Sequence, residues 1–248
     1  MCRLFCWAAN QSVSPIEVLG SDSKLLHDLS LEHKDGWGGA SCNSGVVKAV
    51  HDIKSAAESS SYINFVEDSK STSGMIHLRW ATGDYPVCLE NTHPFVADGM
   101  AFEHNGAFQN VDSIIELIDP KILAGRQGTV DSEIYFFYLR TLLQTKDLKQ
   151  AYEELITVMD KQTAYTSLNA MMLSSTKLYV ISAHSPERRP KDLAENYYDL
   201  SFNLDDSVFS AWSMGVRASE GTKLPNNHIL TVDLADLSLD VEALDLKG

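Results

Sequence analysis

The residue directly after the initiator methionine is a cysteine, in the stretch MCRLFC. A thiol in this position can act as a nucleophile if Met1 is removed, because the freed α-amine then lies beside the sulfur. A model α-amine titrates near ~7.7–8.0 and a model thiol near ~8.5, so the amine can accept the thiol proton. Cys2 is therefore a candidate nucleophile. The alternative is a small buried hydrophobe, which is how a free cysteine usually behaves.

Further stretches combine glycine, aromatic and charged residues where a core strand would have none. They are HKDGWGG (33–39), HLRWATGDYP (77–86), ENTHPF (90–95), EHNGAF (103–108) and GRQGTVDSE (125–133). Each has an ordinary structural interpretation when taken alone. Asn105–Gly106 is a common hairpin turn, and Asp131 before Ser and Glu is typical of a helix cap. Arg79, on the same strand face as His77, could be half of an ion pair.

Four histidines in these stretches raise the question of a metal site: His33, His77, His93 and His104. Zinc motifs carried on a helix place their histidines a few residues apart, on one face. The separations here are too wide and irregular for such a motif. We therefore predict neither a metal nor another cofactor.

The elements that must position these residues follow from the apolar patterns. Strand-like segments include 2–9, 73–82 and 99–108, and residues 36–51 read as a hairpin that turns at Asn43–Gly45. Helical spacing covers 21–33, 55–70, 132–145 and 147–163, of which 132–145 is apolar nearly all round and should be buried on both sides. Five more strands follow, at 166–175, 177–184, 197–205, 208–214 and 227–235. Strands, then helices, then strands predict an α+β fold with helices packed on antiparallel sheets.

Composition excludes several classes of function. The chain has 248 residues and a net charge of −14, which argues against nucleic acid as a partner, because phosphate binding needs a basic face. No apolar run reaches the length of a membrane span, and no secretory signal is evident. Four cysteines without metal or disulfide spacing favour a reducing, cytoplasmic location. With no linker or repeat, we expect one domain over residues 1–248.

Taken together, the motifs resemble those of the class-II glutamine amidotransferases, which are N-terminal nucleophile hydrolases. The matching stretches are MCRLF, HKDGWGG, HLRWAT, ENTHPF, EHNG and TVDSE, in the family's order over residues 2–133. The forms HKDGWG and ENTHPF resemble the short, stand-alone branch, which includes the amidohydrolase of ergothioneine synthesis and the glutathione-degrading amidotransferase-like subunit. The resemblance implies a four-layer α-β-β-α sandwich of two antiparallel sheets flanked by helices.

The resemblance also implies a role for each motif residue. Cys2 is the nucleophile once Met1 is removed, and a retained Met1 would fill the site. Asn105 and Gly106 supply the side-chain amide and the backbone N–H of an oxyanion hole. Arg79 binds the α-carboxylate of the substrate and Asp131 receives its α-ammonium. Thr82 adds polar contacts, and Trp37 shapes the wall beside Cys2.

The implied reaction is attack on the γ-carboxamide of glutamine, which releases ammonia and glutamate through a γ-glutamyl thioester. Where family members commonly continue RWAT with His-Gly, this chain has Gly83-Asp84-Tyr85. The extra charge of Asp84 leaves room for another γ-glutamyl amide as substrate, hydrolysed without ammonia transfer. A catalytically silent protein that binds an amino acid or a partner is the third alternative. Ammonia, if transferred, would go to a separate synthase subunit.

Overall fold

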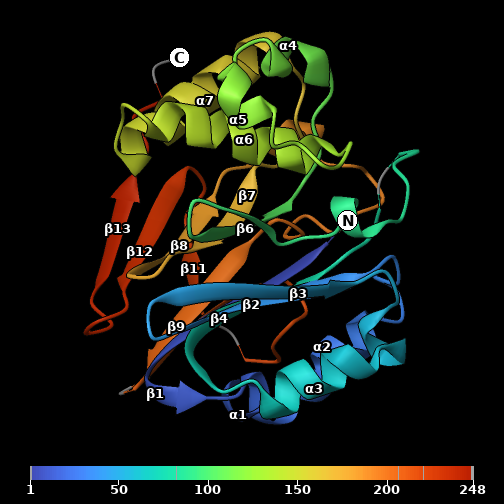
Figure 1. Cartoon of the computed structure of the whole chain (residues 1–248), viewed down its shortest axis with the longest axis vertical. Helices are drawn as coiled ribbons and strands as arrows, with labels where there is room; N and C mark the ends of the chain where they lie inside the picture. The colour runs from blue at the N-terminus through green and yellow to red at the C-terminus, as the bar shows by residue number, and fades with distance from the viewer. Residues whose placement is uncertain (1, 82, 206, 220, 247–248) are drawn as a thin grey trace.

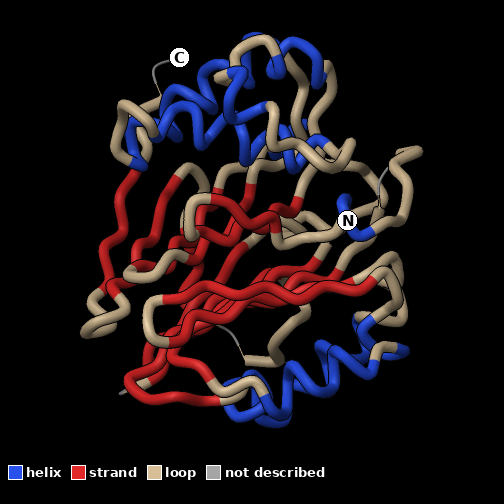
Figure 2. Tube along the Cα trace, in the orientation of Figure 1, coloured by secondary structure: helices blue, strands red, loops and turns tan. Residues whose placement is uncertain are grey.

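Two antiparallel β-sheets stack face to face, and helices cover both outer faces (Figure 1). The computed structural model describes residues 2–81, 83–205, 207–219 and 221–246. In these residues the layers run helix, sheet, sheet, helix, as the colours of Figure 2 show. This confirms the four-layer α+β sandwich that the family resemblance implies.

The first sheet has seven described strands in the order β11-β9-β10-β1-β4-β2-β3. Their bounds are β1 Arg3–Val13, β2 Trp37–Asn43, β3 Val46–Asp52, β4 Ser71–Leu78, β9 Leu200–Asp205, β10 Val208–Ser213 and β11 Thr222–Leu224. Helices α1 (Pro15–Leu19), α2 (Ser23–Leu29) and α3 (Ser60–Asp68) cover its outer face. The predicted hairpin is confirmed as β2–β3, with Ser44 and Gly45 both at positive φ in the turn.

The second sheet has six described strands in the order β13-β12-β8-β7-β6-β5. Their bounds are β5 Phe95–Ala97, β6 Met100–Asn105, β7 Asn169–Leu173, β8 Lys177–Ser182, β12 His228–Asp233 and β13 Leu239–Ala243. Helices α4 (Val111–Ile115), α5 (Pro120–Leu123), α6 (Asp131–Leu143) and α7 (Leu148–Gln162) cover its outer face. The acidic C-terminal segment, which the sequence leaves unassigned, supplies the edge strand β13.

The core lies in three layers, and β1 shows why its sequence is apolar almost throughout. Leu4, Cys6 and Ala8 point into the layer between the sheets. Phe5 and Trp7 point into the layer beneath α1–α3. Because successive side chains of a strand alternate between faces, a strand buried on both sides must be apolar at every position.

Helix α6 is buried on both sides, as its sequence predicts. Residues 131–139 and Leu142 are buried. Phe136 stacks on Phe102 of β6 with ring centroids 4.9 Å apart, and the Tyr135 hydroxyl donates to the Leu168 carbonyl oxygen at 2.9 Å. The helix is thereby fixed over the second sheet with its N-terminus at one sheet end. No described helix combines the length and apolar character needed to cross a membrane.

Candidate active site

The pairing of β1 with β4 brings Cys2 next to Arg79. Arg3 pairs with Leu78 in this antiparallel ladder, so the residue before Arg3 lies beside the residue after Leu78. Both side chains follow the alternation that sends Leu4 and Met75 into the layer between the sheets. Thiol and guanidinium therefore meet at one end of this layer, although they are 77 positions apart in the sequence.

The second sheet contributes from the opposite side. Strand β6 ends at Asn105, and the chain then passes through Gly106 to Phe108. Asn105–Gly106 does not form a hairpin turn, because β6 pairs with β5 and β7 and the chain continues from it into α4. The hairpin interpretation of this dipeptide is therefore wrong. Asp131 is the first residue of α6, one position further into the helix than its cap-like sequence predicts.

These elements enclose a small cavity of about 30 Å³ that Cys2, Arg79, Gly106 and Asp131 line together. Its other lining residues are Trp80, Ala81, Tyr85, Asn91, His93, His104, Val130 and Ser132. Two larger grooves, of about 440 and 400 Å³, lie elsewhere and contain no cysteine. The small cavity is the candidate active site because it alone among the described cavities combines a thiol with charges of both signs.

Arg79 is almost completely buried, at 3% exposure, and its guanidinium is held by main-chain oxygens. Nη1 donates to the Asp35 carbonyl oxygen at 3.2 Å and Nη2 donates to the Pro86 carbonyl oxygen at 3.3 Å. No ion pair joins this guanidinium to a carboxylate within the described residues. A buried cation without an anionic partner is costly, and a substrate carboxylate would supply that partner.

Asp131 is buried as well and is oriented by two main-chain donors. The Phe108 N–H donates to Oδ2 at 3.0 Å, and the Ser132 N–H donates to Oδ1 at 2.8 Å. Burial raises the pKa of Asp131, while these main-chain hydrogen bonds oppose the rise. A substrate ammonium beside this carboxylate would favour its ionised form.

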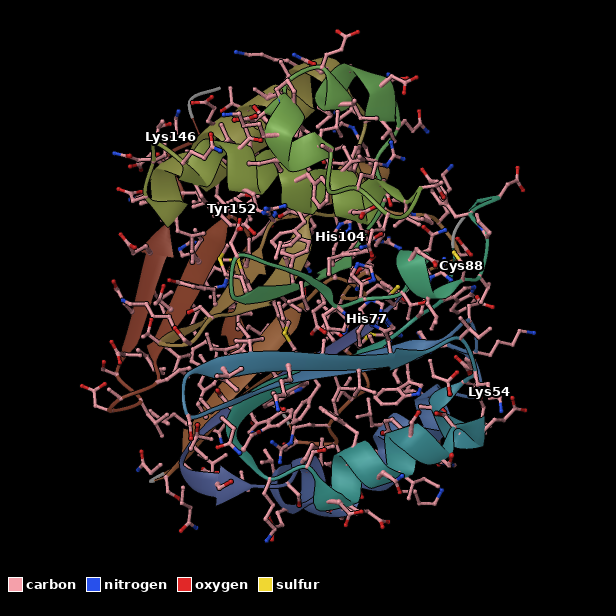
Figure 3. The ribbon with its side chains drawn as sticks, viewed as in Figure 1. Lys54, His77, Cys88, His104, Lys146 and Tyr152 are labelled. Carbon is pink, nitrogen blue, oxygen red and sulfur yellow. The ribbon has the colours of Figure 1, made fainter. Side chains whose placement is uncertain are left out.

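His104 connects Asp131 to the backbone around Gly106. Its Nε2 lies 3.0 Å from the Ser167 carbonyl oxygen, which can only accept, so Nε2 carries the proton. Its Nδ1 then accepts from the Ser132 hydroxyl at 2.9 Å. Burial lowers the pKa of His104, which favours this neutral form. Figure 3 shows His104 above His77, between the two halves of the molecule.

The two residues predicted for the oxyanion hole differ in their surroundings. Gly106 lines the cavity, and a Cβ added to it would lie 1.9 Å from the Ser167 carbonyl oxygen and 2.7 Å from His104 Nε2. Asn105 is fully buried and is not among the lining residues. Neither its Nδ2 nor its Oδ1 has a hydrogen-bond partner among the described residues. Its amide therefore makes no hydrogen bond that stabilises the described fold.

Cys2 is the part-buried thiol of this cavity, and its Sγ donates to the Trp80 carbonyl oxygen at 3.7 Å. Burial raises the pKa of the Cys2 thiol, and the positive charge of Arg79 partly opposes the rise. Cys6 and Cys42 are buried, as expected for small hydrophobic residues, and Cys88 is the second part-buried thiol. All four cysteines are free.

The prediction that Trp37 shapes the wall beside Cys2 is wrong. Trp37 points to the opposite face of the first sheet, where its ring packs on Tyr62 at 5.1 Å and Phe65 at 5.8 Å. The strand alternation explains the error, because Gly38 and Ala40 occupy the face toward the second sheet. Asp84, whose charge prompted a broader choice of substrates, is exposed and does not line the cavity. Thr82 lies outside the described residues.

Several lining residues carry no predicted role. Trp80 and Tyr85 lie in the same loop as Arg79, and Asn91 belongs to ENTHPF. Ser132 follows Asp131 directly, and only tertiary contact with His104 distinguishes it from a helix-capping serine. Three histidines, His77, His93 and His104, do gather near the cavity, but no described group of three His, Cys, Asp or Glu residues has a geometry that could hold a metal ion.

Comparison with solved structures agrees with this architecture. A glutamine aminotransferase class-II domain protein from Silicibacter pomeroyi has a TM-score of 0.70 at 16% identity, and the match covers 98% of this chain and 100% of that one. Glutamine phosphoribosylpyrophosphate amidotransferase from B. subtilis has a TM-score of 0.67 at 15% identity, covering 99% of this chain and 50% of that one. At these identities the likeness establishes the fold, which is that of the N-terminal nucleophile hydrolases.

Family membership comes from the sequence itself. The family model of class-II glutamine amidotransferases matches residues 1–187, well over half of the chain. The chain therefore belongs to the class-II glutamine amidotransferases, a family of enzymes, as its motifs predict. No curated protein matches it in sequence.

Proposed function

We propose that the chain, once Met1 is removed, cleaves the γ-carboxamide of glutamine with the Cys2 thiol and releases ammonia and glutamate. The observation that carries this proposal is the single cavity lined by the Cys2 thiol, the Arg79 guanidinium and the Asp131 carboxylate. The two charges are complementary to the α-carboxylate and α-ammonium of an amino acid. The thiol is the group that can attack its side-chain amide. Membership of the family supports a reaction of the glutamine amidotransferase type.

In the proposed reaction the α-amine of Cys2 accepts the Sγ proton as sulfur attacks the amide carbon. The tetrahedral intermediate then collapses, the C–N bond breaks, and the amine returns the proton to the departing nitrogen. This leaves a γ-glutamyl thioester and free ammonia. Water attacks the thioester, the C–S bond breaks, and glutamate leaves while the thiol is restored.

The developing oxyanion needs donors that are already in place. Gly106 is suited to present its N–H because its surroundings exclude a side chain. The uncommitted Nδ2 of Asn105 is suited to be the second donor, although it lies behind the lining residues and must approach the intermediate when the substrate binds. Arg79 and Asp131 hold the amino-acid head and thereby orient the carboxamide toward sulfur.

A larger γ-glutamyl amide is the second candidate substrate. Trp80 lines the cavity and is 42% exposed, so an apolar surface lies where the cavity meets solvent. That surface would favour a leaving amine with an apolar substituent over ammonia alone. The single domain, the cytoplasmic location and a separate ammonia-accepting subunit stay predictions from the sequence.

The test is glutamate release by protein whose intact mass shows the loss of Met1. Glutamine and a panel of γ-glutamyl amides that includes glutathione serve as substrates. Cys2→Ala should abolish release, whereas Cys88→Ala, which removes the other part-exposed thiol, should leave it unchanged. The preferred amide then distinguishes an ammonia donor from a γ-glutamyl hydrolase.

Two outcomes would contradict the proposal. Retention of Met1 in the native host would block the α-amine and exclude the mechanism. Processed protein that binds glutamate but releases none from any amide would favour the silent, amino-acid-binding alternative.

A further inference from the structure

The two charges that face the cavity lie at the ends of two separate segments that connect regular elements. Arg79 begins the segment 79–94 between β4 and β5, and Asp131, the first residue of α6, directly follows the segment 124–130 that leads from α5 into α6. No strand pairing joins these segments to each other. Main-chain hydrogen bonds hold Arg79 to residues 35 and 36, and Asp131 is held by α6. Side-chain contacts between the two segments therefore add the link between the two sides of the cavity, because irregular backbone without such contacts has many conformations.

Asn91 makes those contacts. Its Oδ1 accepts from the Thr129 N–H at 2.8 Å, which also fixes which end of the amide is oxygen. Its Nδ2 donates to the Pro86 carbonyl oxygen at 3.0 Å and to the Thr129 hydroxyl at 3.2 Å. The side chain is 1% exposed. Both amide hydrogens are thus used within the protein, so Asn91 is not free to bind a substrate although it lines the cavity.

The Pro86 carbonyl oxygen is shared with Arg79. Nη2 of Arg79 donates to it at 3.3 Å, from the same segment that Asn91 spans. A carbonyl oxygen has two lone pairs and can accept both bonds. Asn91 therefore holds the acceptor that orients the guanidinium, and one amide group connects the cationic and anionic sides of the cavity.

The anionic side is reinforced from α6. The Glu133 carboxylate accepts from the N–H groups of Gln127 and Gly128 at 2.9 and 2.8 Å. Gly128 also packs closely against Asn91, since a Cβ on it would lie 2.5 Å from Asn91 Oδ1. Glu133 thus holds the two residues before Thr129, and Asn91 holds Thr129 itself, two residues before Asp131.

We propose that Asn91 is a positioning residue that sets the distance between the carboxylate-binding and ammonium-binding groups, Arg79 and Asp131. This inference rests on the proposed function, in which those groups hold one amino-acid head. Asn91 thereby makes the site selective for ligands that carry both charges on one carbon. Without it, each charge would still bind its counterpart, but the two would no longer act together.

The test measures binding, so that it does not depend on turnover. Glutamate, glutarate (which lacks the α-ammonium) and 4-aminobutanoate (which lacks the α-carboxylate) are titrated calorimetrically into Met1-processed protein carrying Cys2→Ala. With Asn91 present, glutamate should bind best. Adding Asn91→Ala should weaken the binding of glutamate by about ten- to a hundredfold, the worth of one or two hydrogen bonds to charged groups. It should weaken the binding of glutarate and of 4-aminobutanoate, which each keep only one of the two α-groups, by about threefold or less.

Two further variants separate positioning from simple loss of stability. Asn226→Ala removes an asparagine that bridges segments away from the cavity through Nδ2 to the His184 carbonyl oxygen and Oδ1 to the His184 N–H, both at 2.8 Å. It should lower the melting temperature without changing the preference for glutamate. Asn91→Asp keeps the acceptor for the Thr129 N–H but loses the donor to the Pro86 carbonyl oxygen, which orients Arg79. It should therefore weaken the binding of glutarate more than the binding of 4-aminobutanoate.

Equal weakening of all three ligands by Asn91→Ala, or no weakening of glutamate, would overturn the inference. So would the absence of a glutamate preference when Asn91 is present. Failure of the proposed function would show differently, as normal glutamate binding without release of glutamate from any amide by the Cys2 enzyme.

Discussion

The imidazole rings of His77 and His93 stack with their centroids 4.1 Å apart, and both residues are buried. His77 donates from Nε2 to the His104 carbonyl oxygen at 3.2 Å, which leaves its Nδ1 without a proton. Two imidazolium rings could not stack this closely, and burial lowers the pKa of both residues, which favours neutral rings. His93 lines the cavity and His77 packs behind it, where neutral rings fill space between the sheets without adding charge.

Acid should therefore destabilise the protein well above the range in which carboxylates titrate. The pKa of His77 is lowered to about 3, chiefly by burial and also by the positive charge of Arg79, against the opposing effect of the hydrogen bond to the His104 carbonyl oxygen. The folded pKa is below the unfolded value near ~6.5, so the stability is present above pH 6.5 and is lost as pH falls toward 3. Each such histidine contributes a slope of about 1.4 kcal/mol per pH unit.

Denaturant unfolding at pH 7, 6, 5 and 4 measures this slope. His77→Gln can still donate to the His104 carbonyl oxygen. It should reduce the slope of unfolding free energy against pH by about 1.4 kcal/mol per pH unit, the contribution of one proton. His27→Gln, at an exposed position, serves as the control and should leave the profile unchanged. Equal slopes in all three proteins would refute a neutral, buried His77.

Glu103 should make the protein less stable as the pH rises, which is the opposite of the effect of His77. It is fully buried on β6, and neither carboxylate oxygen has a hydrogen-bond partner among the described residues. Burial raises the pKa of Glu103 well above its usual value. Because the folded pKa exceeds the unfolded one, the stability is present below about pH 4.3 and is lost as pH rises.

Replacing Glu103 by glutamine should consequently stabilise the protein at pH 8, by at least the ~1.4 kcal/mol that one pKa unit represents. The gain should shrink at pH 4.5, and Glu195→Gln at an exposed position should show neither effect. Unfolding free energies at the two pH values decide the matter. A gain of equal size at both would mean that Glu103 is not held in its protonated form.

Asn105→Ala should reduce kcat by about 10²–10³ while leaving stability unchanged or slightly higher. The reason is that the Asn105 amide makes no hydrogen bond to the described protein, so its removal leaves no partner unsatisfied. Asn169 is its cross-strand neighbour and the matched control. That amide donates to the Tyr198 carbonyl oxygen at 2.6 Å and accepts from the Ala183 N–H at 2.8 Å.

Asn169→Ala should therefore lose stability, by about 1–3 kcal/mol, because it leaves two buried main-chain groups unpaired. Thermal unfolding and steady-state kinetics of both variants separate the two roles. If Asn105→Ala unfolds as easily as Asn169→Ala, the Asn105 amide is structural and the assignment to the oxyanion site fails.

Gly106→Ala should damage both the fold and the activity. The added methyl would overlap the Ser167 carbonyl oxygen, and main-chain atoms cannot move aside without disturbing β7. We expect a loss of about 2 kcal/mol or more, as is typical of overpacking at a rigid site. Gly125→Ala is the control, because its nearest neighbour would be at 3.4 Å, and wild-type-like melting of Gly106→Ala would contradict the close packing.

Local patterns in the sequence were sufficient for much of the fold. The β2–β3 hairpin follows from its turn residues, and α6 and α7 follow from their apolar periodicity, because both signals are short-range. The short elements α1, β11 and β13 were not predicted. Their pairing or packing depends on distant parts of the chain, and β13 in particular is a strand because β12 offers it an edge.

The sequence by itself determined the family, the nucleophile candidate and the identity of the charged residues, because motif order and residue chemistry are properties of the chain. Tertiary structure decided which of these residues share a cavity. Trp37 was excluded because strand alternation sends it to the helix-facing side, and Asn105 was placed behind Gly106. The bridging contacts of Asn91 exist only in the folded chain, where Pro86 and Thr129 both lie within hydrogen-bond distance of its amide. Such contacts depend on sheet register and stacking, which no local pattern encodes.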